Sequence, residues 1–219
     1  MSTLALLGGT FDPVHVGHLR AAIEAREALR ADEIRLLPCA VPPHREQPAV
    51  GPEQRLLMLQ AAIEGIPGLR ADARELQRSG PSFTYDTLVS LRVEIGEQRP
   101  LVLVLGADAF AGLPSWHRWR EINRLAHIAV LTRPDSSSLI DPRLEDLLAS
   151  AGTADPAGLG VIPAGKVLRL QIPPMPVSST LVRTRLRQGR SVRFLVPDAV
   201  IDMIADAGWY GAGNPLQRA

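Results

Sequence analysis

The chain has 219 residues, of which 46% are hydrophobic, and its formal net charge is +1. This length suits one large α/β domain, alone or with a small C-terminal addition, and the apolar content excludes a disordered chain. A charge this small gives no general attraction to nucleic acid or membranes, so any anion site has to be local. Cys39 is the single cysteine, which excludes an intrachain disulfide. No apolar run reaches the roughly 20 residues of a membrane span and no signal-peptide pattern is present, so we expect a cytoplasmic protein.

The first part of the chain alternates between strand and helix patterns. Apolar residues predict a strand at 4–7, a helix at 19–30 and a second strand at 34–37. This spacing is typical of a βαβ unit with parallel strands. A proline-rich loop at 40–48 leaves the carboxyl end of the second strand, where ligands bind in open parallel sheets.

The middle of the chain continues the alternation. We expect a helix from Pro52 to about residue 65, then an extended stretch near 69–75. The next helix should be capped by Ser82, Thr84 or Asp86.

The second half begins with the most strand-like run of the chain. Residues 101–105 are uninterrupted aliphatic, which predicts a central strand covered on both faces. Further strands are expected at 128–131 and 167–172, with a short helix at 144–149. The seven residues from Gly160 to Lys166 fit the start of a P-loop. However, Val167 stands where that motif needs Ser or Thr, and a strand pattern follows in place of a helix, so we reject it.

The most informative stretch runs from Gly8 to His18 and reads G-G-T-F-D-P-V-H-V-G-H. It lies between the first strand and the first helix. Paired glycines let backbone N–H groups approach a ligand, and a helix N-terminus adds N–H donors with a partial positive charge. With His15 and His18 on the loop at the mouth of the helix, the stretch predicts a phosphate site. The alternative is a glycine turn with two helix-capping histidines.

A second helix start near the C-terminus has similar chemistry. Ser178, Ser179 and Thr180 precede a helical pattern, and Arg183 lies one turn further on the same side. Hydroxyls, free N–H groups and a guanidinium suit a multiply charged phosphate chain. The alternative is an ordinary N-cap with a solvated arginine. A last helix should begin at Pro197, and we expect the tail after Gly208 to fray.

Together, the two strings resemble the nucleotidylyltransferase superfamily. The first matches every fixed position of G-G-T-F-D-P-x-H-x-G-H, and the second matches I-S-S-T-x-x-R with Val177 in place of Ile. The resemblance implies an α/β fold, with a Rossmann-like, doubly wound parallel sheet and a small C-terminal helical part. It implies a nucleotidyltransferase core at residues 1–176, and a helical segment at 177–219 that completes the ATP site.

Other local strings are similar to those of bacterial nicotinate-nucleotide adenylyltransferases. They are P-P-H-R at 42–45, F-T-Y-D-T at 83–87, G-A-D at 106–108 and W-H-R-W at 116–119. This resemblance implies attack by the phosphate of nicotinate mononucleotide on the α-phosphorus of ATP, which gives nicotinate adenine dinucleotide and pyrophosphate in NAD biosynthesis. It also implies Mg²⁺ held mainly through the ATP phosphates, with no metal ligand from the protein.

The resemblance further implies a set of site residues. Those expected to act in catalysis are His15, His18 and Arg183. Those expected to bind ATP are Gly8, Gly9, Thr10, Phe11, His15, His18, Gly106, Asp108, Ser178, Ser179, Thr180 and Arg183. Those expected to bind nicotinate mononucleotide are His44, Arg45, Phe83, Thr84, Tyr85, Asp108, Trp116 and Arg133.

Particular roles follow from position in those strings. Trp116 should stack on the pyridine ring, and the backbone N–H groups from Phe83 to Tyr85 should meet its carboxylate. Arg45 stands where the family commonly has Lys, which keeps the charge but not the geometry. His127 carries no motif and should be structural.

Three alternatives to this function stay open. The acceptor could be nicotinamide mononucleotide or phosphopantetheine, or the chain could be a non-catalytic nucleotide-binding protein on the same fold. A dehydrogenase is disfavoured because Gly8-Gly9 is not a G-x-G-x-x-G string. The expected partners are ATP and nicotinate mononucleotide, without nucleic acid or membrane. The oligomeric state is left open, a homo-oligomer included.

Overall fold

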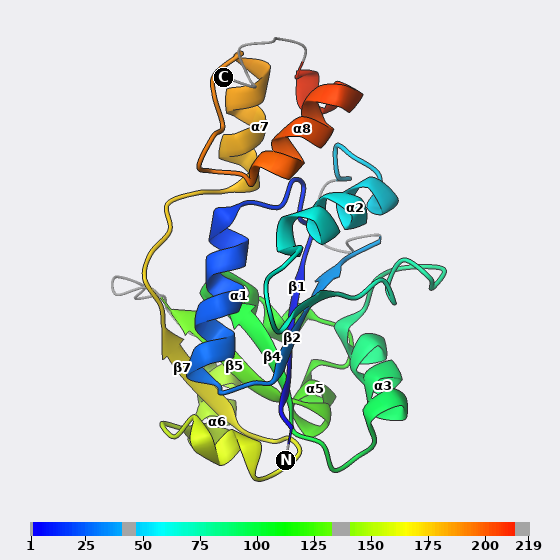
Figure 1. Cartoon of the computed structure of the whole chain (residues 1–219). Helices are drawn as coiled ribbons and strands as arrows, with labels where there is room; N and C mark the ends of the chain where they lie inside the picture. Colours follow the sequence, from blue (N-terminus) through cyan, green and yellow to red (C-terminus); the bar gives the residue numbers. More distant parts are fainter. Residues whose placement is uncertain (1, 41–46, 133–140, 213–219) are drawn as a thin grey trace.

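A computed structural model of the chain describes residues 2–40, 47–132 and 141–212 (Figure 1). Within these ranges, seven strands form one parallel sheet in the order β3-β2-β1-β4-β5-β7-β6. The strands are β1 (Leu4–Gly9), β2 (Glu33–Pro38), β3 (Leu69–Ala71), β4 (Leu101–Gly106), β5 (His127–Thr132), β6 (Gly152–Thr153) and β7 (Val167–Gln171).

Helices connect the strands and extend beyond them. The α-helices are α1 (Val16–Ala28), α2 (Pro52–Ile63), α3 (Thr84–Ile95), α4 (Ala107–Ala111), α5 (Trp119–Leu125), α6 (Pro142–Ala151), α7 (Ser179–Arg187) and α8 (Asp198–Ala207). Three 3₁₀ turns are also described: η1 (Leu113–Ser115), η2 (Ala157–Gly160) and η3 (Trp209–Gly211).

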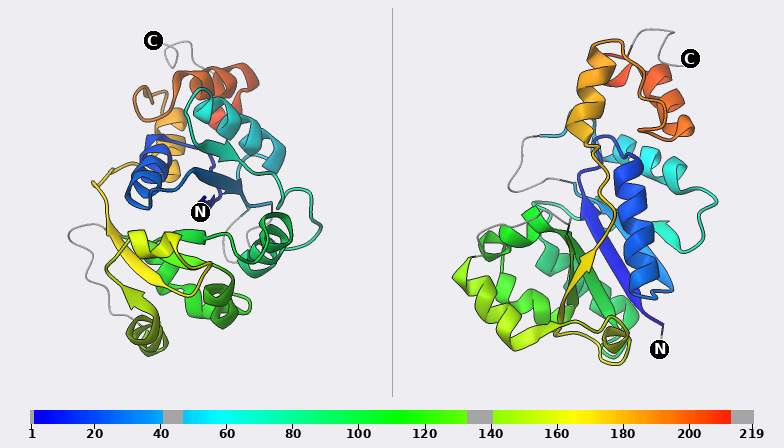
Figure 2. Two further views of the ribbon diagram at one scale, coloured as in Figure 1. Left: turned by 60° about the horizontal axis from the view of Figure 1, so that its bottom comes forward. Right: turned by 90° about the vertical axis from the view of Figure 1, so that its left-hand side faces the viewer.

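The sheet is apolar on both faces because helices cover both of them (Figure 2). Alternate strand residues such as Ala5 and Leu7 pack with α1 and α2, while Leu4 and Leu6 pack with α3, α5 and α6. A fully covered parallel sheet accounts for the continuous aliphatic runs of β1 and β4. The predicted Rossmann-like α/β fold is confirmed.

The C-terminal helices lie beyond the carboxyl ends of the strands. In Figure 1 the chain leaves β7 and runs up to α7 and α8, above the end of β1. Val182 of α7 and Ile204 of α8 belong to the same hydrophobic cluster as α1 and α2. The C-terminal segment is therefore packed against the phosphate-loop end of the sheet.

Two of the predicted helix starts are wrong. α1 begins at Val16, not at residue 19, so His18 lies in its first turn and not on the loop. α3 follows Phe83, whose side chain makes no cap, and Ser82 does not cap the helix because its Oγ accepts a hydrogen bond from the N–H of Ala40 (3.0 Å). Ser82 is used to join the start of α3 to the end of β2.

The predicted fraying after Gly208 is wrong for residues 209–212, and residues 213–219 lie outside the described ranges. Residues 209–211 form η3, and Ala212 is buried in the main cluster. The rejected P-loop and the structural role of His127 are both confirmed. Val167 starts β7, and buried His127 contacts the carbonyl of Ile162 through Nε2 (2.9 Å). No helix in the described ranges is long and apolar enough to cross a membrane.

Candidate active site

The candidate site lies where the chain direction across the sheet reverses. From β1 the chain adds β2 and then β3 on one side of the sheet. It then crosses to the other side of β1 and adds β4 and then β5. Ligands of open parallel sheets bind outside the carboxyl ends of the strands at such a point. Gly9 ends β1, and Gly106 ends β4 just before the exposed Asp108 in the first turn of α4. Gly8, Gly9, Gly106 and Asp108, all predicted to bind ATP, thus lie at this edge of the sheet.

The loop after β1 turns tightly around Phe11. This residue has a φ of +50° and is buried, and its ring lies beneath Gly9. A Cβ added at Gly9 would stand 2.9 Å from the ring, so a larger residue there would displace it. The N–H groups of Thr10 and Phe11 donate to no residue within the described ranges. They are available to an anion.

Two histidines stack at the start of α1. The rings of His15 and His18 have centroids 3.7 Å apart and are inclined by 22°. The backbone N–H of His15 donates to Nδ1 of His18 (3.3 Å), so the proton of a neutral His18 is on Nε2. His18 therefore presents an N–H donor at Nε2.

Burial controls the charge of this pair. His15 is only 5% exposed, and desolvation lowers its pKa from 6.5 to about 4. A neutral His15 can stack on His18 without charge repulsion. The capping role suggested by the alternative interpretation is real for His18, whose Nδ1 accepts from the N–H of His15 at the N-cap of α1.

The start of α7 is attached to the same loop. Ser178 caps the helix through its Oγ, which accepts from the N–H of Leu181 (3.1 Å). Ser179 Oγ donates to the carbonyl of Pro13 (3.0 Å), 166 residues away. Arg183 donates through Nη1 to the carbonyl of Asp12 (2.6 Å) and through Nη2 to Thr180 Oγ1 (3.4 Å). The structure thus brings the two predicted phosphate strings together.

Arg55 is a residue of this site that the sequence analysis missed. It is fully buried in α2, and its guanidinium donates only to backbone carbonyls among the described residues. Nη1 reaches Thr10 (2.6 Å), Nη2 reaches Cys39 (2.7 Å) and Nε reaches Val50 (3.1 Å). The sequence did carry a signal for this role, because Arg55 lies on the apolar face of the predicted helix together with Met58 and Leu59.

Asp12 and Tyr210 were also missed. Asp12 is 4% exposed, and its carboxylate accepts from the N–H of Ala49 (2.8 Å) and from the hydroxyl of Tyr210 (2.7 Å). Asp12 was within the quoted string but had no assigned role. Tyr210 had no local signal, because its partner lies 198 residues away.

The predicted acceptor side gathers at the start of α3. The ring of Phe83 lies 4.6 Å from that of His117, and the guanidinium of Arg118 lies 3.9 Å from the centre of the Tyr85 ring. Trp116 is half-buried against the core cluster under α3 and α5. Thr84 and Tyr85 are the first two residues of α3, whose N–H groups have no partner inside the helix. The N–H of Phe83 is already used, since it donates to the carbonyl of Pro81.

Three predicted acceptor residues, His44, Arg45 and Arg133, lie outside the described residues. A buried pair supports the start of α3, all of which is described. Thr87 Oγ1 donates to Glu75 Oε1 (2.7 Å), and desolvation raises the pKa of the Glu75 carboxyl group. Arg78 contacts Thr87 and the carbonyl of Phe83 at the edge of this pair. These contacts hold the N-terminus of α3 in place.

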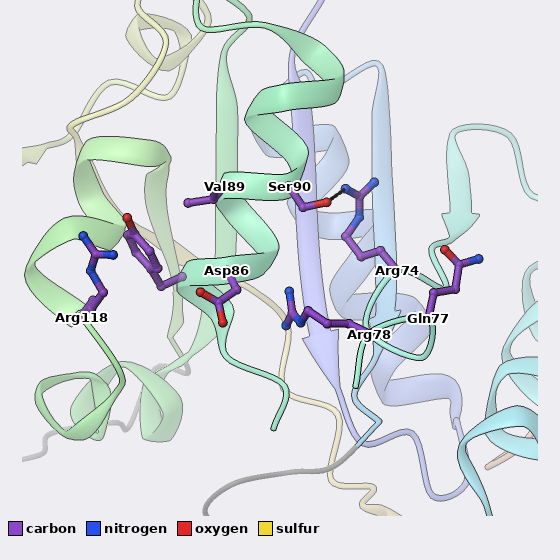
Figure 3. A pocket seen from close by; sticks show the side chains of 8 residues that line it. Arg74, Gln77, Arg78, Asp86, Val89, Ser90 and Arg118 are labelled. Atoms are coloured by element: carbon purple, nitrogen blue, oxygen red, sulfur yellow. Dashed lines mark hydrogen bonds between the residues drawn. The ribbon is translucent and has the colours of Figure 1, made fainter. Parts of the chain in front are cut away.

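A pocket of about 550 Å³ opens on the outer side of α3 (Figure 3). It is lined by Arg74, Gln77, Arg78, Tyr85, Asp86, Val89, Ser90 and Arg118. Figure 3 shows Arg118 on one side of Asp86 and Arg78 and Arg74 on the other. Arg74 is paired with Asp72 and Glu94, and Arg118 with Glu121. Tyr85 is the one predicted substrate residue in the lining.

The described residues offer no preformed set of metal ligands. No three His, Cys, Asp or Glu side chains in these ranges lie close enough to hold a metal ion. A metal at this edge of the sheet would therefore take most of its ligands from a bound phosphate chain and from water.

Known proteins resemble this chain along almost its whole length. The cytidylyltransferase-like family model matches residues 6–185. A relative from Pseudomonas putida strain W619, described as a probable nicotinate-nucleotide adenylyltransferase, is 50% identical over 96% of each chain. A relative of the same description from Pseudomonas aeruginosa PAO1 is 50% identical over 92% of this chain and 94% of its own.

A solved structure supports the fold. Nicotinic acid mononucleotide adenylyltransferase of Plasmodium falciparum, complexed with NaAD, superposes with a TM-score of 0.72 at 17% identity. The match covers 97% of this chain and 99% of that one. With the two predicted phosphate strings in contact and relatives at 50% identity matched over 92–96% of this chain, the chain belongs to the nicotinate-nucleotide adenylyltransferases within the cytidylyltransferase-like family.

Proposed function

We infer that this chain transfers the adenylyl group of ATP to nicotinate mononucleotide, giving nicotinate adenine dinucleotide and pyrophosphate. The observation that carries the inference is the contact of Arg183 and Ser179 with residues 12 and 13. This contact places a helix N-terminus, hydroxyl groups and a guanidinium next to a glycine-rich loop with its own free N–H groups. Such a concentration of donors suits a triphosphate.

The reaction needs alignment more than a protein nucleophile. An oxygen of the acceptor phosphate forms a bond to the α-phosphorus, and the bond from that phosphorus to the bridging oxygen breaks. Pyrophosphate leaves with the electron pair of that bond. The Nε2–H of His18 donates to a phosphoryl oxygen as negative charge moves to the leaving group. The N–H groups of Thr10 and Phe11, with Arg183, hold the phosphates.

A divalent metal that accompanies ATP fits this arrangement. We propose Mg²⁺, held mainly by phosphate oxygens, because the described residues offer no carboxylate cluster at the site. When bound, it neutralises charge on the phosphate chain.

The start of α3 supports nicotinate as the acceptor base. The N–H groups of Thr84 and Tyr85 lack the usual side-chain cap, because Phe83 has no side-chain oxygen. A carboxylate accepts hydrogen bonds from such donors, whereas the NH₂ of an amide must donate. Trp116 stacks on the pyridine ring in this proposal. Asp108, in the first turn of α4 just after β4, contacts both substrates in this proposal.

The test is a pyrophosphate-release assay with three acceptors in parallel. We expect kcat/KM for nicotinate mononucleotide to exceed that for nicotinamide mononucleotide by at least roughly 100-fold. A mispaired amide costs about 1–3 kcal/mol, the charge-assisted hydrogen bond to the carboxylate adds a similar amount, and each 1.4 kcal/mol is tenfold. Phosphopantetheine should give no turnover. Equal kcat/KM for both mononucleotides would overturn the nicotinate assignment alone, and no release with any acceptor would favour a binding protein.

A further inference from the structure

Asp12 is a buried carboxylate next to the arginine assigned to ATP, yet it does not form a close ion pair with it. Arg183 Nη1 donates to the main-chain carbonyl of Asp12 at 2.6 Å, whereas the nearest carboxylate oxygen, Oδ2, is 3.7 Å away. Both carboxylate oxygens already have other donors. Oδ1 accepts from Tyr210, and Oδ2 accepts from the N–H of Ala49.

We propose that Tyr210 is a positioning residue for ATP binding, because its hydroxyl occupies the Asp12 carboxylate and so leaves the Arg183 guanidinium available for the phosphates. This inference rests on the proposed function of Arg183. If the hydroxyl is removed, Oδ1 of Asp12 loses its donor inside the protein. A buried carboxylate oxygen seeks a new donor, and the Arg183 guanidinium, 3.7 Å from Oδ2 of the same carboxylate, is a strong donor close by. Arg183 would then be held by the protein in competition with ATP.

The surroundings of Tyr210 support a dedicated role for the hydroxyl. Burial raises the pKa of this tyrosine, so the group stays protonated and remains a donor. The residue has a φ of +60°, between Gly208 and Gly211, which also have positive φ. The left-handed turn of η3 directs the tyrosine back to residue 12. Nothing in the core packing alone requires a hydroxyl at this position.

The first experiment is Tyr210→Phe, which removes one oxygen and keeps the ring. We expect KM for ATP to rise about 5- to 20-fold, because Arg183 would lose only a fraction of the usual strength of a charge-assisted contact with the phosphates. KM for nicotinate mononucleotide should stay within about twofold. Ser150→Ala is the matched control, because it removes a hydroxyl that bonds only within α6. It should leave both constants unchanged.

The second experiment separates positioning from general loosening of the structure. In the double variant Asp12→Asn with Tyr210→Phe, the neutral amide no longer attracts the guanidinium. We expect this variant to recover at least half of the lost ATP affinity on a logarithmic scale. If the Tyr210 hydroxyl had a purely structural role, the double variant would recover no ATP affinity, because Asp12→Asn would only add to the loss caused by Tyr210→Phe.

Binding of a non-hydrolysable ATP analogue, measured by titration calorimetry, keeps this inference distinct from the proposed function. Weaker analogue binding by Tyr210→Phe, with recovery in the double variant, supports the role of Tyr210 even if no acceptor gives turnover. Unchanged analogue binding by Tyr210→Phe, or an equal rise in KM for both substrates, overturns it.

Discussion

His15 is a neutral imidazole in the folded protein at neutral pH, because burial lowers its pKa to about 4. Two functions depend on this neutrality. The ring can stack on His18 at 3.7 Å, and His18 keeps the hydrogen-bond pattern that directs a proton to Nε2. The protonation state of one buried ring thus controls the geometry of its neighbour.

The stability of the protein should therefore fall in mild acid. Between about pH 6.5 and pH 4 the unfolded chain protonates His15 and the folded chain does not, so the free energy of unfolding decreases as pH falls through this window. The loss due to His15 should be about 2 kcal/mol between pH 7 and pH 4.5. Urea unfolding at both values checks this, with His15→Asn as the comparison. Equal losses in the two proteins would contradict the assignment.

Replacement of His18 should separate its two roles. His18→Ala should lower kcat by roughly 10²–10⁴, because the donor aimed at the developing charge is lost. It should also cost about 1 kcal/mol of stability, because the N–H of His15 loses its acceptor. His18→Asn can restore the cap through its side-chain oxygen. It should recover the stability without recovering kcat, and a recovered kcat would show that capping alone was needed.

At the level of whole elements, α2 stabilises the loop after β1. It brings Arg55 to the carboxyl ends of β1 and β2, where the guanidinium donates to the carbonyls of Thr10 and Cys39. These carbonyls lie at the places where the two strands leave the sheet. One side chain therefore satisfies several buried acceptors, and it fixes the direction in which the loop N–H groups point.

Arg55→Met should be among the most destabilising substitutions in the chain. It leaves buried carbonyls without donors, which should cost more than about 3 kcal/mol in the free energy of unfolding. Leu57→Ala, on the same helix but 51% exposed, is the matched control and should cost below about 1 kcal/mol. Chemical denaturation of both variants gives the comparison. Similar losses would mean that Arg55 is a solvated residue in solution.

At the scale of the molecule, the sites proposed for the two substrates lie mostly on different parts of the chain. The ATP side combines the loop after β1 with α7, while the acceptor side combines the start of α3 with the segment before α5. The core clusters on opposite faces of the sheet support them separately. A substitution at one of the two proposed sites should leave substrate binding at the other unchanged.

Arg183→Ala and Trp116→Ala should therefore have opposite kinetic signatures. Arg183→Ala should weaken ATP binding by about 1.5–3 kcal/mol, the usual loss of a charged hydrogen bond, and leave KM for nicotinate mononucleotide near normal. Trp116→Ala should raise KM for both mononucleotide acceptors alike, because stacking does not distinguish acid from amide. Steady-state kinetics with each substrate varied in turn would show it. Equal effects on ATP and acceptor would place either residue elsewhere.

The sequence predicts what is encoded by local pattern. β1, β4 and β7 are continuous or alternating apolar runs, and the helix start at Ser178 has a standard side-chain cap, so all were predicted. β6 has only two residues and no pattern of its own. Phe83 stands at the N-cap position of α3 and makes no side-chain cap, so no capping rule identifies this helix start. Asp12 and Arg55 receive their roles from partners on other elements, and such contacts need the fold to be known.

The hydrogen bond between Tyr210 and Asp12 joins residues 198 positions apart, so it can form only late in translation. All seven described strands are translated once Gln171 has been added, and the residues up to Tyr210 take about 2 to 8 s more at usual synthesis rates. A nascent chain can therefore hold an assembled sheet before it holds a complete nucleotide site. Products of premature termination in this interval would fold in part yet lack Arg183 or its support. Such fragments should bind ATP more weakly than the complete chain.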